Sequence, residues 1–130
     1  MSMSSIETVA MVIDGTTSST KYYAAPPSVP SRLVGMRVST NASQSSSAPV
    51  KAGLAGNTNP TFSLDLNGKD TGQMHVADYD GSASDAEKMQ EFDNASPVEL
   101  DVSLASTGKV VVYLEFDPMM IGQGQDSLYA

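Results

Sequence analysis

The pattern of apolar and polar residues is most regular in residues 97–118, PVELDVSLASTGKVVVYLEFDP. Two stretches alternate strictly, and a Ser-Thr-Gly turn lies between them. The apolar positions are Val98, Leu100, Val102 and Leu104, then Val110, Val112, Leu114 and Phe116. Because successive side chains of a strand point to opposite faces, this period of two predicts two antiparallel strands joined by a turn. One face of their sheet should be packed and the other wet.

The second of these strands also carries apolar residues on its outer face. Val111 and Tyr113 interrupt the polar row there. An exposed Val-Tyr pair on a sheet indicates cover by a neighbouring loop or by another subunit. Both residues are therefore interface candidates.

Two further strands are predicted near the N-terminal end of the chain. Residues 6–13 are apolar and end at an Asp14-Gly15 turn signal. Residues 32–39 resume strand character, with both arginines expected off the buried face. The buried positions of that strand are expected to be Val34, Met36 and Val38.

A hairpin is predicted in the middle of the chain. Residues 60–66 alternate in the same way and end at Asn67-Gly68, a dipeptide that favours hairpin turns because both residues tolerate positive φ. Residues 73–79 are the expected partner strand. The side chains expected to face inward are Phe62, Leu64, Leu66, Met74 and Val76.

One short helix is predicted over residues 84–92. Ser84 followed by Glu87 has the spacing of a capping box. Apolar residues recur at helical spacing after it, at Ala86, Met89 and Phe92.

These elements predict one domain, residues 1–130, of the all-β class: an antiparallel β-sandwich of jelly-roll type with one short helix. Residues 16–31 are rich in Ser, Thr and Pro, and residues 40–59 in small polar residues. Both are predicted to be extended loops or arms. Residues 119–130 lack periodicity and are expected to form a C-terminal tail. Its adaptable apolar side chains are interface candidates: Met119, Met120 and Ile121.

The net charge of −8 is unevenly placed along the 130 residues. Residues 1–60 hold four basic and two acidic side chains, whereas residues 61–130 hold three basic and thirteen acidic ones. A solvated acidic face is the favoured interpretation, and the alternative is that the near-neutral half docks on a partner. An acidic surface repels phosphate, so no nucleic-acid partner is expected.

Other features of the composition limit the class of protein. The longest apolar runs have five residues, whereas a membrane-spanning helix needs about 20, so no membrane partner is expected. The chain has no cysteine, which excludes disulfides and thiolate chemistry and favours an intracellular origin or stabilisation by assembly. The first residues lack the basic and apolar regions of a signal peptide.

No catalytic constellation is visible, and neither enzymatic activity nor a cofactor is expected. His75 is the only histidine, and its place in a strand pattern indicates a surface or edge-strand side chain. A zinc-type site would need a cluster of His or Cys. A glycosidase would need two carboxylates about 5–10 Å apart in one cleft, usually beside aromatic platforms, and the chain has no tryptophan.

The acidic stretch ADYDGSASDAE, residues 77–87, is the only candidate metal site. Asp78, Asp80 and Asp85, with Gly81 in the turn, could supply oxygen ligands to calcium. Their spacing does not fit an EF-hand. The favoured interpretation is an acidic turn that leads into a capped helix, whose dipole stabilises the nearby carboxylates. On that interpretation the chain has no metal site.

Residues 60–118 resemble the jelly-roll domains of tailed-bacteriophage capsid decoration (cement) proteins. The resemblance rests on PTFSLDLNG, the short capped helix and VELDVSLASTGKVVVYLEFDP, and it covers about half of the chain. It implies a structural virion protein, made in the host cytoplasm, that binds the outside of an icosahedral capsid as a homotrimer. There it would cement neighbouring subunits of the major capsid protein. The alternatives are another virion part, such as a head-fibre or tail component, and a carbohydrate- or calcium-binding β-sandwich module.

Overall fold

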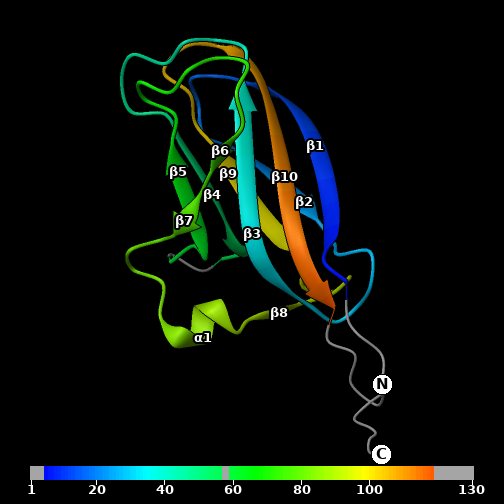
Figure 1. Cartoon of the computed structure of the whole chain (residues 1–130). Coiled ribbons are helices and arrows are strands. Elements are labelled where there is room, and N and C mark those ends of the chain that lie inside the picture. Colours follow the sequence, from blue (N-terminus) through cyan, green and yellow to red (C-terminus); the bar gives the residue numbers. More distant parts are fainter. Residues whose placement is uncertain (1–4, 57–58, 119–130) are drawn as a thin grey trace, which may run out of the picture.

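A computed structural model describes residues 5–56 and 59–118, which form an antiparallel β-sandwich, as the alternation predicts (Figure 1). Sheet A contains, in spatial order, β1 (Glu7–Gly15), β10 (Gly108–Pro118), β3 (Ser31–Thr40) and β6 (His75–Val76), and β8 (Glu91–Phe92) also pairs with β3. Sheet B contains β2 (Thr20–Ala24), β9 (Val98–Val102), β4 (Pro49–Leu54), β5 (Phe62–Asp65) and β7 (Asp78–Tyr79).

The strands pair from the two ends of the chain inward. β1 pairs with β10, β2 with β9, β3 with β6 and β8, and β4 with β5. Each sheet therefore combines strands from both halves of the sequence. As a result, the charge difference between the halves of the sequence does not separate onto the two sheets.

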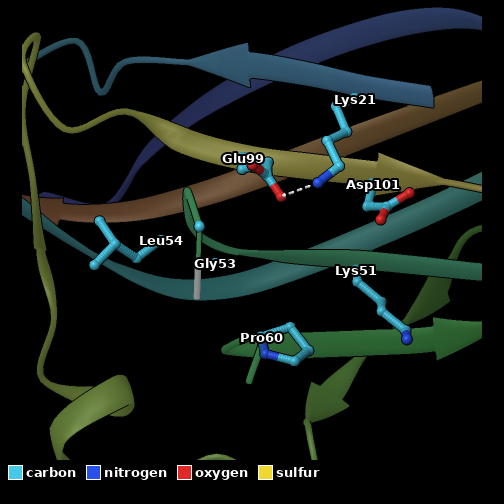
Figure 2. A pocket seen from close by; sticks show the side chains of 8 residues that line it. Lys21, Lys51, Gly53, Leu54, Pro60, Glu99 and Asp101 are labelled. Atoms are coloured by element: carbon cyan, nitrogen blue, oxygen red, sulfur yellow. Dashed lines mark ion pairs between the residues drawn. The ribbon is translucent and has the colours of Figure 1, made fainter. Parts of the chain in front are cut away.

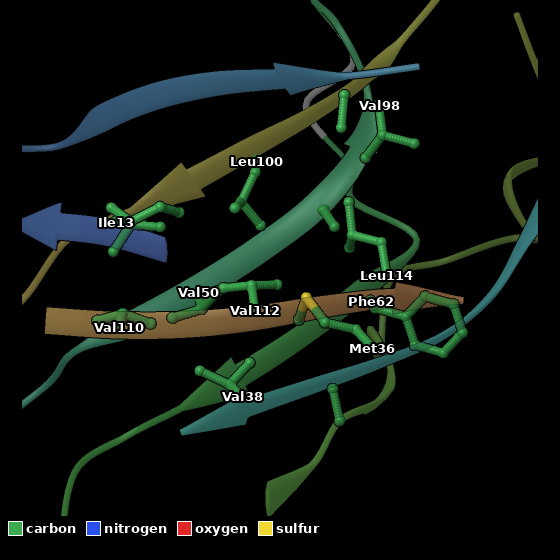
Figure 3. Close-up of a cluster of buried hydrophobic side chains, with 14 of the residues drawn as sticks. Ile13, Met36, Val38, Val50, Phe62, Val98, Leu100, Val110, Val112 and Leu114 are labelled. Carbon is green, nitrogen blue, oxygen red and sulfur yellow. The ribbon is translucent and has the colours of Figure 1, made fainter. Parts of the chain in front are cut away.

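The core lies between the two sheets (Figure 3). All eight apolar positions of the alternating rows in residues 97–118 are at most 3% exposed, as predicted. The prediction that the two stretches form neighbouring strands is wrong, because β9 belongs to sheet B and β10 to sheet A. The residues between them cross from one sheet to the other, with the N–H of Leu104 donating to the carbonyl of Thr16 at 3.0 Å. The two apolar rows thus face each other across the core.

Two details of the N-terminal strands also differ from the prediction. β1 does not turn at Asp14-Gly15 but continues to Gly15, which pairs with Gly108. In β3 the residue on the buried face is Leu33, whereas Val34 is only half-buried. The cause is a register shift against β10 between Glu115 and Phe116, which changes the alternation of β3 at that point.

The hairpin predicted in the middle of the chain forms only in part, because just residues 78–79 of the expected partner strand pair with β5, and they do so without a tight turn at Asn67-Gly68. β5 pairs with β7, whereas β6 pairs with β3 in the other sheet. Phe62 and Leu66 are buried, and Leu64 packs against the core, as expected. Met74 and Val76 instead face outward, with 39% and 69% of their surface exposed. The neighbouring Ala77 takes the buried position, where its N–H donates to the carbonyl of Met36 at 2.9 Å.

The predicted arms are not continuous loops. β2 lies within residues 16–31 and β4 within residues 40–59, and each pairs with one side of β9. The predicted tail, residues 119–130, lies outside the described residues, and so do its interface candidates Met119, Met120 and Ile121.

The helix is shorter than predicted. α1 spans only Asp85–Lys88, and the capping box of Ser84 and Glu87 is present at its start. Met89 caps its C-terminal end, and the chain then enters β8, where Phe92 pairs with Ser31 and is 1% exposed. Burial of the Phe92 ring in sheet A outweighs the helical spacing of the sequence. Within the described residues no helix has the length and apolar character needed to cross a membrane.

Candidate functional site

The outer face of sheet A carries apolar side chains on three of its strands, β1, β10 and β6. We call this group the apolar face, and its members are Ala10, Val12, Val76, Val111 and Tyr113. Val12 is opposite Val111 and Ala10 is opposite Tyr113 in the β1–β10 ladder. Val12 and Val76 are each 69% exposed. The four members on β1 and β10 are cross-strand neighbours and contact one another, whereas Arg37 of β3 lies between Tyr113 and Val76.

The centre of the apolar face is held in place by a charged cluster. The guanidinium carbon of Arg37 lies 5.3 Å from the centroid of the Tyr113 ring, a cation–π arrangement. The Arg37 Nε atom also lies 3.4 Å from the Glu115 carboxylate in an ion pair. Glu115 in turn lies over Gly35, where a Cβ atom would collide with its carboxylate. Tyr113 and Val111, the interface candidates of the sequence, are therefore half-buried within their own subunit and ordered before any partner binds.

The outer face of sheet B is charged and carries a hollow of about 320 Å³ (Figure 2). Glu99 and Asp101 project from β9 at its centre, with Lys21 of β2 and Lys51 of β4 on either side. The Lys21 ammonium lies 3.4 Å from the Glu99 carboxylate, and the Ser19 hydroxyl donates to Asp101 at 2.6 Å. Two cations and two anions leave this hollow close to neutral.

Gly53 forms the floor of the hollow. The main chain at Pro60 and Thr61 approaches so closely that a Cβ atom at Gly53 would lie 2.9 Å from the Thr61 nitrogen. Only glycine fits this close approach without a shift of the backbone. The tyrosine beside the hollow, Tyr23, is 56% exposed, and its hydroxyl lies 3.5 Å from Glu99.

The calcium candidates do not come together into a metal site. Asp80 is occupied by local hydrogen bonds: one carboxylate oxygen accepts from the Ser63 hydroxyl at 2.7 Å, and the other accepts from the N–H and the hydroxyl of Ser82. These bonds to the ionised form lower the pKa of Asp80, with the Ser82 hydroxyl contributing most. Asp78 lies exposed on β7 and Asp85 lies in the first turn of α1. Within the described residues no group of three or more His, Cys, Asp or Glu is placed to hold a metal ion, so Asp78, Asp80 and Asp85 do not form a shared cluster.

His75 lies on the short edge strand β6, as its sequence position indicates. Its Nε2 atom lies 2.9 Å from the carbonyl of Asp70, five residues earlier. This contact connects the strand to the preceding loop, and it gives His75 a structural role.

Sequence reasoning missed the hollow because Lys21 and Lys51 lie in the segments predicted as loops. The only signal was the polar row Glu99, Asp101 and Ser103 on β9, whose cross-strand neighbours could not be known. Comparison of the chain with protein-family models, with curated proteins and with solved structures found no match.

Proposed function

We propose that this protein is a structural virion component that binds the outside of an icosahedral phage capsid and links neighbouring subunits of the major capsid protein. The observation that carries the proposal is the apolar face, which presents Val12 and Val76 at 69% exposure on a sheet whose centre is already ordered. An exposed apolar surface on a rigid sheet favours contact with another protein. The nested strand pairing supports a sandwich of the jelly-roll type, which occurs in viral capsid domains.

The size of the apolar face limits how strongly one copy can bind. Strands of about ten residues, roughly 34 Å long, and three strand spacings of about 4.8 Å give an area of roughly 500 Å² for the whole outer face of sheet A, and the apolar face is only part of it. A stable interface buries about 800 Å² on each partner. One copy should therefore bind a shell weakly, and several linked copies would be needed for firm attachment. The homotrimer implied by the resemblance would supply three.

The test is sedimentation of the purified protein with shells of the major capsid protein encoded in the same genome. Val76→Glu places a charge on the apolar face, and because Val76 is 69% exposed on an edge strand the fold should be retained. Val29→Glu is the matched control, since Val29 is 50% exposed in the loop between β2 and β3 and lies off that face. We expect the first variant to lose sedimentation with the shells and the control to keep it. Equal binding by both variants would reject the apolar face as the docking surface.

A carbohydrate-binding module is the second candidate function, and the hollow on sheet B favours it. Carboxylates and ammonium groups of equal number suit a neutral ligand with many hydroxyls, and the exposed Tyr23 ring could stack on a sugar. The test is calorimetric titration with cellohexaose, maltohexaose and chitohexaose. Binding that is lost in Asp101→Asn and kept in Asp93→Asn, a carboxylate in the loop after β8, would support this candidate. No heat with any of the three sugars would count against it.

A further inference from the structure

β1 is a long edge strand whose outer edge pairs with no described strand. All nine of its residues pair with β10 on one side, and sheet A ends at β1 on the other. Natural edge strands are usually short, or protected by Pro or Lys. β1, with the sequence ETVAMVIDG, has neither; its two charged residues, Glu7 and Asp14, lie near its ends, and its centre is an apolar run of five residues.

The backbone groups on this free edge can be identified from the neighbouring ladder. Lys109 of β10 directs both its N–H and its carbonyl toward Asn41, next to β3. Because backbone groups alternate in direction along a strand, Val110, Val112 and Leu114 point the other way, toward β1. Their partners on β1 must point back to β10, and the intervening residues must point outward. The residues with outward N–H and carbonyl groups are Thr8, Ala10, Val12 and Asp14.

We propose that a second copy of this chain pairs with this edge, β1 against β1, antiparallel about a twofold axis at Met11. This register places Ala10 opposite Val12 of the second copy and Thr8 opposite Asp14 of the second copy. All four outward-pointing residues then lie in hydrogen-bonded pairs, and Met11 faces its own equivalent in a closely spaced pair.

The side chains support this register over its neighbours. Ala10 and Val12 form apolar pairs on the outer face, and the Thr8 hydroxyl can donate to the Asp14 carboxylate. Glu7 lies opposite Gly15, so no like charges meet. A shift by two residues in either direction would put Asp14 opposite Ile6 or opposite Ala10, and either pairing would desolvate a carboxylate against an apolar side chain.

The pairing has a consequence for the outer surface. Two copies of sheet A would become one continuous sheet, and their outer faces would join across the twofold axis into a surface of roughly 1,000 Å², twice the single-copy value, with the apolar residues of β1 from both copies at its centre. The pairing does not rest on the capsid proposal. It is an alternative to the homotrimer as the linked form of the protein in solution, and the mass of the particle distinguishes the two.

The first experiment is light scattering of the full chain in solution. The expected mass is twice the chain mass of 13.6 kDa, and a monomer or a trimer would overturn the proposal. Val12→Pro removes an outward N–H but no hydrogen bond to β10, so it should give a monomer with an unchanged far-UV circular dichroism spectrum. Val12→Thr keeps the N–H and is the matched control that should stay dimeric. A Val12→Pro variant that stayed dimeric would overturn the proposal.

The second experiment tests the register and does not depend on the proline variant. The chain has no cysteine, so a single introduced thiol can link only to its copy. Met11→Cys should form a disulfide-linked dimer on mild oxidation, because the two positions face each other in a closely spaced pair. Val12→Cys, which faces Ala10 of the second copy and not itself, should remain unlinked under the same conditions. Linkage of Val12→Cys without linkage of Met11→Cys would overturn the register.

Discussion

Gln44 connects the loop after β3 with the crossing between β9 and β10, and its replacement by alanine should be strongly destabilising. The side chain is 1% exposed although it lies in a segment predicted as a loop. Its Nε2 atom donates to the carbonyls of Ala42 and Ser106 at 3.1 and 2.8 Å. Its Oε1 atom accepts from the N–H groups of Ala105 and Ser106, both at 2.8 Å. One amide thus holds the crossing between β9 and β10 in place.

The expected loss can be calculated from these bonds. Gln44→Ala leaves two backbone N–H groups without a partner in a part-buried site, and each such group costs about 1–3 kcal/mol. The variant should therefore lose about 2–6 kcal/mol of unfolding free energy, and about 4 kcal/mol is the central value. A domain of this size has a total stability of about 5–15 kcal/mol, so the loss is a large fraction of the whole.

Equilibrium unfolding in urea, followed by far-UV circular dichroism, measures this loss. With a denaturant slope of about 2 kcal/mol per molar, the midpoint should fall by roughly 2 M without a change in slope. Gln90→Ala is the matched control, because the Gln90 amide makes one exposed hydrogen bond to the carbonyl of Glu91, and its effect should stay within about 0.5 kcal/mol. A loss below about 1 kcal/mol for Gln44→Ala would refute the reasoning, since water would then be satisfying the freed N–H groups.

Four other substitutions test other parts of the structure. Leu100→Asp should abolish cooperative unfolding, because Leu100 is 0% exposed and the new charge would have no partner; a folded variant would contradict the sandwich core. Gly53→Ala should cost about 1–3 kcal/mol in urea unfolding through backbone collision, whereas Gly81→Ala, with open space around the new methyl group, is its control. Asp80→Asn should destabilise the protein at pH 7, and the difference from wild type should shrink as the pH falls below 4. The reason is that a folded-state pKa below the ordinary 3.8 stabilises the protein at pH values above 3.8, and this stabilisation is lost as the pH falls and the carboxylate protonates. A difference between the two proteins that stayed constant across that pH range would argue against a stabilising role for the Asp80 carboxylate. Tyr113→Ser should keep the fold, with a loss of about 0.5–1 kcal/mol from the cation–π contact with Arg37, and it should weaken shell binding; unchanged binding would count against the interface role of Tyr113.

The alternation of apolar and polar residues was sufficient to predict which side of β9 and of β10 is buried. Leu100 and Val112 are both fully buried, as their rows require. Alternation says which face a residue takes, but it does not say which strand lies beside it. Two apolar rows joined by a turn can pair side by side or face each other across a core, and both arrangements bury the same residues. The position of β9 and β10 in opposite sheets was therefore not predictable from residues 97–118.

The strands that the sequence concealed have weak hydrophobic signals of their own. β4 buries Val50, Ala52 and Gly53. Alanine and glycine are too small to give the apolar alternation by which a strand is recognised in a sequence. β4 forms because it lies between β9 and β5 and pairs with both. The role of Gln44 is concealed in the same way, since its partners lie about 60 residues later in the chain. Contacts of this kind depend on the final topology, so no local pattern predicts them.

Docking and pairing, the two uses proposed for sheet A, rely on different atoms and can fail separately. Docking uses side chains of the apolar face, and pairing uses the outward main-chain groups of β1. Val76→Glu changes the first without reaching the β1 edge, because β10 and β3 lie between them. Val12→Pro removes the second and leaves Val76 in place. If β1 pairing fails and docking survives, the outer face of one sheet A, roughly 500 Å² in area, binds the shell weakly by itself. Firm attachment would then need copies that are linked through another surface. If both hold, the β1 pair itself supplies the linked copies, and the Val12→Pro monomer should release from the shell at concentrations where the dimer stays bound.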